Sequence, residues 1–258
     1  MKRILSVLLA TLLLVSLPAA FAEGNAQRYQ GPGYITPEEA LTAYVGAMSR
    51  SDLMGMLSVF ALESFVEEAD PARAHQAVSP RVLFSDATNI IVNDEYTRQL
   101  KLIQRISEIT DVLYRQYIFF SVDDAQQFMM NIVDRRKEDK NAAYVALFSE
   151  NHFAQIFSGC EVIEPLLLSD MPEYATNERV ITNLAANCVL YGCDEIRPAG
   201  IWIRTPEEDY LLTAECCRYG DAWYILNLGG ALSYALNIDF NACGLTTRTA
   251  LQLSGHMD

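Results

Sequence analysis

The chain has 258 residues, of which 51% are hydrophobic and 20% are charged, with 19 Lys and Arg against 33 Asp and Glu. This hydrophobic content supports a packed core and excludes global disorder, and the length suffices for one large domain or two small ones. The net charge of −14 would repel polyphosphates, so it excludes nucleic acid as the main partner and a basic patch for anionic lipid.

Residues 1–22 have the pattern of a cleavable export signal. Two basic residues precede an apolar run, Ile4–Leu17, and Ala20–Ala22 places small residues at the positions that a signal peptidase reads. The run spans about 21 Å as a helix, which is shorter than the roughly 30 Å core of a bilayer. We therefore expect cleavage before Glu23, no membrane span in the mature chain, and a secreted or periplasmic location at the cell exterior. The chain also has no Asn-x-Ser/Thr sequon, which favours a bacterial source.

The residues that follow predict a flexible leader and then a pair of helices. Residues 23–33 are polar and end in Gly and Pro, which is typical of a flexible segment. Thr36 can cap a helix in which Pro37 takes the first position and Glu39 completes a capping box. Asp52 can cap a second helix. Apolar residues recur behind both caps at helical spacing: Leu41, Tyr44, Val45 and Met48, then Leu53, Met56, Leu57, Phe60 and Phe65.

The middle of the chain predicts a helical block over about 93–157. Apolar residues step by four, three, four and four positions through Leu102, Ile106, Ile109, Leu113 and Tyr117. Further helices are expected from Ser121 to about 137 and over 141–152. We interpret the block as a helical insertion in a single domain over 34–258.

The last third predicts an antiparallel meander of three strands, because turn residues separate Ile201–Ile203, Tyr210–Arg218 and Trp223–Leu228. On the middle strand the alternation predicts a buried face and a wetter face: Leu212, Ala214 and Cys216 on the first, Thr213, Glu215 and Cys217 on the second. A closing helix is expected over 232–239. Helices followed by a meander indicate the α+β class.

Two segments, Thr36–Leu41 with the helix behind it and Arg218–Ile225, resemble the NTF2-like (cystatin-like α+β) superfamily. The resemblance implies an N-terminal helix pair packed into the concave face of a curved antiparallel sheet. It also implies an exported bacterial domain of a kind that often has no assigned activity. The helical block is longer than in a typical member, and no catalytic residue is carried over.

All six cysteines lie in the last hundred residues. An even number of cysteines permits disulfides in an oxidising compartment. We prefer a bond between Cys188 and Cys193, which would close a short loop. Cys216 and Cys217 are adjacent on a strand and point to opposite faces, so they do not bond to each other, and a bond between Cys217 and Cys243 is the open alternative.

Four aromatic residues of the meander are candidates for lining a ligand pocket, the alternative being a packed sheet core: Trp202, Tyr210, Trp223 and Tyr224. No phosphate-binding loop, nucleophile elbow, dinucleotide fingerprint or His-Glu-x-x-His motif occurs. His152 and Glu150 are two positions apart and would not face each other on a helix. The sequence therefore predicts no catalytic, metal or cofactor-binding residue and no cofactor.

These observations predict an exported, non-catalytic domain that binds a small ligand or a protein at the bacterial cell exterior. An extracellular hydrolase with a spatially assembled site is one alternative. An interaction protein that docks through its helical block is another. A pocket lined by Trp202 or Trp223 would favour a small ligand. A contiguous exposed apolar patch within 93–157 would favour docking of a protein.

Overall fold

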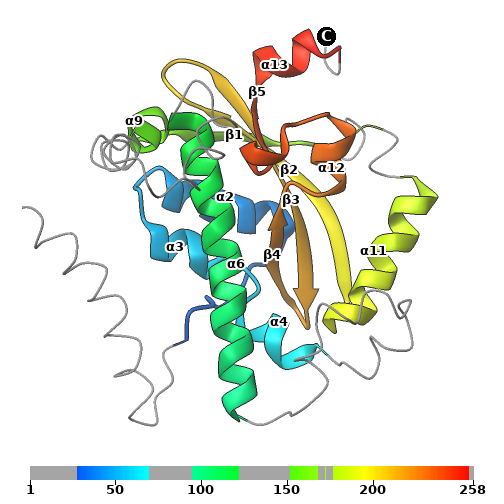
Figure 1. The fold of residues 1–258 in the computed structure, drawn as a ribbon. Coiled ribbons are helices and arrows are strands. Elements are labelled where there is room, and N and C mark those ends of the chain that lie inside the picture. The colour runs from blue at the N-terminus through cyan, green and yellow to red at the C-terminus, as the bar shows by residue number, and fades with distance from the viewer. Residues whose placement is uncertain (1–27, 70–94, 122–151, 168–171, 173–176, 256–258) are drawn as a thin grey trace, which may run out of the picture.

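A computed structural model describes residues 28–69, 95–121, 152–167, 172 and 177–255 (Figure 1). The predicted signal, residues 23–27 of the predicted leader and the helices predicted between 121 and 152 lie outside the described residues. The elements in chain order are α2 (Pro37–Met48), α3 (Leu53–Ser58), α4 (Glu63–Glu68), α6 (Glu95–Ser121), α9 (His152–Phe157), β1 (Glu161–Pro165), α11 (Glu178–Tyr191), β2 (Glu195–Arg204), β3 (Asp209–Tyr219), β4 (Ala222–Leu228), α12 (Ala231–Ala235), a 3-10 turn (Phe240–Ala242), β5 (Leu245–Thr247) and α13 (Arg248–Leu253).

The strands form one curved antiparallel sheet in the order β1-β2-β3-β4 (Figure 1). The long strand β3 has two partners on its other side: β4 pairs with Ala214–Tyr219, and β5 pairs with Tyr210–Leu212. The α+β class and the predicted meander are confirmed, with β1 and β5 added to it. The first strand of the meander is longer than expected, since β2 already begins at Glu195.

Helices cover both faces of the sheet. α2 lies across one face, whereas α11 and α12 pack on the other (Figure 1). Leu212 and Cys216 of β3 therefore enter the core beneath α2, while Cys217 enters a second cluster beneath α11. The expectation of a wetter face on β3 was wrong, because Thr213 and Cys217 are both fully buried by the helices on that side.

The two predicted N-terminal caps are confirmed. The Thr36 hydroxyl accepts a hydrogen bond from the Glu39 backbone N–H at 3.2 Å, and the Glu39 carboxylate accepts one from the N–H of Ile35 at 3.1 Å. Asp52 accepts from the N–H of Gly55 at 2.9 Å and so starts α3. These bonds satisfy N–H groups that the first turn of a helix leaves without partners.

The end of the predicted leader is tied to the fold. Gln30 is buried, and its side-chain oxygen accepts hydrogen bonds from the N–H groups of Leu62 and Ser64 at 2.7 and 3.0 Å. The carboxylate of Glu63 accepts from the N–H of Tyr29 at 2.6 Å. Gln30 therefore caps the start of α4, which otherwise lacks a side-chain cap, and Glu63 holds the backbone of Tyr29.

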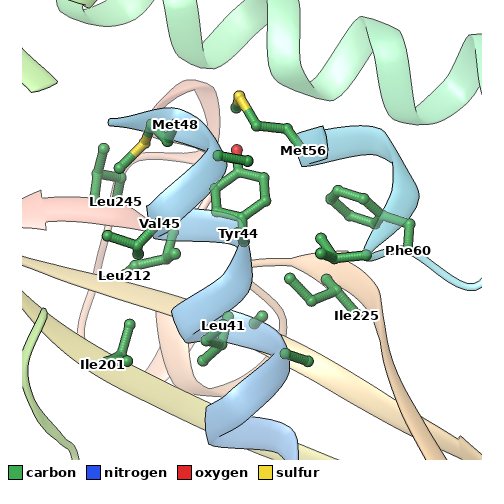
Figure 2. Close-up of a cluster of buried hydrophobic side chains, with 14 of the residues drawn as sticks. Leu41, Tyr44, Val45, Met48, Met56, Phe60, Ile201, Leu212, Ile225 and Leu245 are labelled. Atoms are coloured by element: carbon green, nitrogen blue, oxygen red, sulfur yellow. The ribbon is translucent and has the colours of Figure 1, made fainter. Parts of the chain in front are cut away.

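The main core lies between α2 and the sheet, with α3 and α6 closing it (Figure 2). Tyr44 stands at its centre between Met48, Met56 and Phe60, and none of its surface is exposed. The apolar positions predicted along α6 are confirmed where the helix meets this core, since Ile109 and Leu113 are buried. The long helix therefore belongs to the same packing unit as the N-terminal pair.

Candidate functional site

The structure does not bring the four candidate aromatic residues together. Tyr210 and Trp223 belong to the core beneath α2, Tyr224 packs beneath α11, and Trp202 packs with Leu232 of α12. Each of the four is at most 8% exposed. Trp223 and Tyr224 are neighbours on β4, so the alternation of a strand sends them to opposite faces. The four side chains are used as sheet core on both faces.

Two of the candidate cysteines lie side by side at the end of α11. Gly192 ends this helix in the left-handed conformation, with φ +68°. The backbone N–H groups of Gly192 and Cys193 both donate to the carbonyl of Cys188, the second at 3.2 Å. The Cys193 thiol also donates to the carbonyl of Cys188 at 4.0 Å, and the two thiols lie close enough for each to shift the pKa of the other. Both cysteines are in the thiol form in the structure.

Cys217 joins this pair from β3, and Cys243 does not. Cys217 is opposite Ile196 at the start of β2, and it packs in the same cluster as Cys193. Cys243 lies in the turn before β5, where its carbonyl accepts a hydrogen bond from Gln116 of α6 at 3.3 Å. The structure therefore groups three thiols beneath α11 and places the fourth candidate beside α6.

The three grouped thiols are poor nucleophiles as they stand. Burial raises the pKa of Cys193 to about 12, and burial also raises the pKa values of Cys188 and Cys217 above the ordinary thiol value. A nucleophilic cysteine needs the opposite shift, because the thiolate is the reactive form. The cluster is therefore protonated at neutral pH and is not arranged for covalent catalysis.

A buried arginine beside the thiols was not singled out from the sequence. Arg105 of α6 is 6% exposed, and it donates from Nε to the carbonyl of Ala61 at 3.2 Å and from Nη2 to the carbonyl of Leu226. Its guanidinium lies 4.3 Å from the ring centre of Phe65. Burial lowers the pKa of Arg105, and the nearby Glu108 carboxylate opposes that effect. The side chain joins α6 to the segment before α4 and to β4.

The outer side of α6 carries an exposed apolar stripe. Tyr96, Leu100 and Ile103 are 67%, 48% and 44% exposed. Their spacing of four and three residues places them on one face of the helix. We call these three residues the α6 stripe. Together they form an apolar surface that the described part of the fold leaves in contact with solvent.

The described residues contain neither a metal-binding cluster nor a membrane-spanning helix. No group of three or more His, Cys, Asp and Glu side chains among them is arranged to hold a metal ion. Likewise, none of the helices in this part of the chain is both long enough and apolar enough to cross a bilayer.

The fold is of the α+β class, with helices on both faces of an antiparallel sheet. No family model matches the chain, and no curated protein matches it. Among solved structures, the chain is similar to a cystatin-like protein from Ruminococcus gnavus, with 14% sequence identity and a TM-score of 0.40. The similarity covers 82% of this chain and 44% of that one, so it spans less than half the length of that protein.

Proposed function

We propose that the protein is exported, is cleaved between Ala22 and Glu23, and acts at the cell exterior as a non-catalytic binding protein that docks another protein on the α6 stripe. The observation that carries this proposal is the exposure of Tyr96, Leu100 and Ile103 on one face of a single helix. Contiguous exposed apolar surface on a folded domain is typical of interaction sites. The burial of the four candidate aromatic residues leaves a small-ligand pocket without its predicted lining.

Charge favours a different protein over a second copy as the occupant. The whole chain has a net charge of −14. A second copy would bring another strongly acidic body against the first and would be repelled. A different protein that has an apolar contact surface and is not itself strongly acidic fits the stripe better.

Site-specific photo-crosslinking in an exporting bacterial host tests this docking site. A benzophenone amino acid is placed at Tyr96 or Leu100, and at Asp111 as a control that is exposed about two turns further along α6. We expect one discrete adduct heavier than the monomer at the stripe positions and none at the control. The substitution Ile103→Glu should abolish the adduct formed at position 96, because a charge then lies within the apolar contact.

Three other results would contradict the docking proposal. An adduct at the mass of the monomer means that the chain itself covers the stripe. An adduct at twice that mass identifies a second copy as the occupant. Equal adducts at position 111 and at the stripe mean that the contact is not specific.

Export is tested separately by the N-terminal sequence of the protein recovered outside the cytoplasm. We expect this sequence to begin at Glu23. A cytoplasmic protein that keeps residues 1–22 would contradict the proposed location.

We also infer that the fold belongs to the NTF2-like superfamily. The support is architectural: the capped helix α2 lies across one face of a curved antiparallel sheet, and the hairpin of β3 and β4 forms the edge beside it. A solved structure of a functionally assigned member that superposes on α2 and β2–β4 in the same order would test this inference. Superposition only with a different strand order would contradict it.

A further inference from the structure

The end of α11 is built so that two thiols meet. When a residue in the left-handed conformation follows a helix, the next residue donates its N–H back to a carbonyl in the last turn, and the side chains of those two residues come into contact. At this position Gly192 is the left-handed residue, Cys193 is the donor and Cys188 supplies the carbonyl. The contact that is usually made by two apolar side chains is here made by two thiols.

Neighbouring segments fix the position of the turn at Gly192. A Cβ atom on Gly192 would lie 2.0 Å from the carbonyl oxygen of Glu68, so the turn is held against the end of α4. On the other side, the Tyr219 hydroxyl donates to the carbonyl of Tyr191 at 3.1 Å. The thiols of Cys188 and Cys193 are therefore held together by the fold and not by chance rotamers of an exposed loop.

We propose that Cys188 and Cys193 form a disulfide in the exported protein, that this bond fastens the end of α11 to the start of β2, and that Cys217 remains a thiol which takes the place of Cys188 when that residue is missing. The proposal rests on the proposed export, since an oxidising compartment is needed to keep the bond. Cys217 is the natural substitute because it packs in the same cluster as Cys193.

The oxidation needs a disulfide-carrying oxidant. One thiol, as its thiolate, attacks the oxidant and forms a mixed disulfide, and one half of the oxidant leaves as a thiolate. The second cysteine sulfur then attacks the mixed disulfide, forms the bond between Cys188 and Cys193, and releases the other half. The two cysteines lose two electrons and two protons in total, and the oxidant gains them as two thiols.

The experiment is oxidative refolding of the full chain with glutathione disulfide as the oxidant, followed by alkylation without reductant and tryptic digestion. Trypsin leaves Cys188 and Cys193 in one peptide, residues 180–204, because Pro198 follows Arg197 and blocks cleavage there. We expect this peptide to be unalkylated and lighter by two hydrogen atoms than its reduced form. A second cleavage after Tyr191 should leave its two halves joined. The other four cysteines should be alkylated.

Variants then test which cysteines take part in the disulfide. Cys188→Ala should produce a link between peptides 180–204 and 205–218, whereas Cys193→Ala should produce no link. The Cys188→Ala measurement is made with Cys216→Ala added, because Cys216 and Cys217 share the second peptide. Cys243→Ala is the control and should leave the bond in peptide 180–204 unchanged.

The wild-type measurement needs no substitution, so it tests the disulfide even if one of the variants fails to fold. Six alkylated thiols in the refolded wild type would overturn it, and so would loss of the bond in Cys243→Ala. The refolding assay does not depend on export. A protein that forms the bond in glutathione but keeps residues 1–22 in its host would therefore contradict the proposed location and not the disulfide.

Discussion

The hydroxyl of Tyr44 donates a hydrogen bond to Oε1 of Gln116 at 2.9 Å and so joins α2 to α6 inside the core. Nε2 of Gln116 in turn donates to the carbonyl of Cys243 at 3.3 Å. Tyr44 and Gln116 are both fully buried, and burial raises the pKa of Tyr44 well above its ordinary value. The phenol therefore keeps its proton at neutral pH and acts as the donor to Gln116.

Removing the phenol oxygen of Tyr44 should lower the stability of the protein, because the hydrogen bond to Gln116 is lost. Tyr44→Phe leaves Oε1 of Gln116 buried without its donor, and we expect a loss of about 1–3 kcal/mol in the free energy of unfolding. Urea denaturation measures it. Gln116→Met and the double variant complete the cycle, and the double variant should lose less than the two single losses added together. Strict additivity would contradict a direct bond between the two side chains.

Gly192 and Gly220 offer a matched pair for the end of α11. Both have positive φ, +68° and +61°, but a Cβ atom would lie 2.0 Å from the Glu68 carbonyl oxygen at position 192 and would meet nothing within 4 Å at position 220. Gly220→Ala should cost about 1–2 kcal/mol from the left-handed backbone alone. Gly192→Ala should cost more, about 2–5 kcal/mol, because overpacking is added. Thermal and urea unfolding measure both, and equal losses would mean that α4 moves away freely.

The parts of the fold that were predicted correctly are those set by neighbouring residues. The cap at Thr36 and the period of α6 depend on spacings of three and four positions. α11 was missed because it turns Ile181 and Val189 outward, so its apolar residues do not mark its buried face. The start of β2 was missed because Pro198 argues against a strand. β1 pairs with β2 only from Ile201 onward, so Pro198 lies where β2 has no partner on that side.

The candidate site was predicted only where the contact is local. Cys188 and Cys193 are five positions apart and meet through one turn, whereas Cys217 reaches them through the register that sets it opposite Ile196. The sequence contained one indication that Arg105 is buried, since it precedes Ile109 and Leu113 at intervals of four on the buried face of α6. A charged residue on the apolar face of a helix indicates a buried polar contact. Which carbonyls accept its hydrogen bonds depends on the packing of distant segments.

Arg105 should be far more important for stability than an exposed arginine of the same helix. Arg105→Met leaves the carbonyls of Ala61 and Leu226 without the donor, and we expect a loss of about 2–4 kcal/mol in the free energy of unfolding. Arg105→Lys should recover only part of it, because one ammonium does not reproduce the planar fork. Arg98→Met is the control, since Arg98 is exposed and lies 3.7 Å from Glu95; it should change stability by less than about 0.5 kcal/mol. Similar losses for the two Met variants would contradict the role given to Arg105.

Glu215 is a carboxyl group inside the sheet region. It lies on β3 at a bulge, opposite Asn227 of β4, and it accepts a hydrogen bond from the N–H of Ala231 at 3.2 Å. Burial raises the pKa of Glu215, although the hydrogen bonds from Ala231 and Asn227 partly oppose that shift. The folded protein therefore binds a proton at this position over a pH range in which the unfolded chain has already released it.

The sign of the resulting pH dependence follows from this difference in bound protons. Between the ordinary pKa of a glutamate, about 4.3, and the raised pKa of folded Glu215, stability should fall as the pH rises. Glu215→Gln mimics the protonated form, so it should match the wild type near pH 4 and be more stable than the wild type near pH 8. Urea unfolding of both proteins at intervals between these values measures the difference, and a tenfold tighter hold on the proton in the folded state corresponds to about 1.4 kcal/mol. Glu207→Gln, in the exposed turn between β2 and β3, controls for the removal of one negative charge from an acidic protein. A gain that is the same at every pH, or the same for both variants, would show that Glu215 titrates as it does in the unfolded chain.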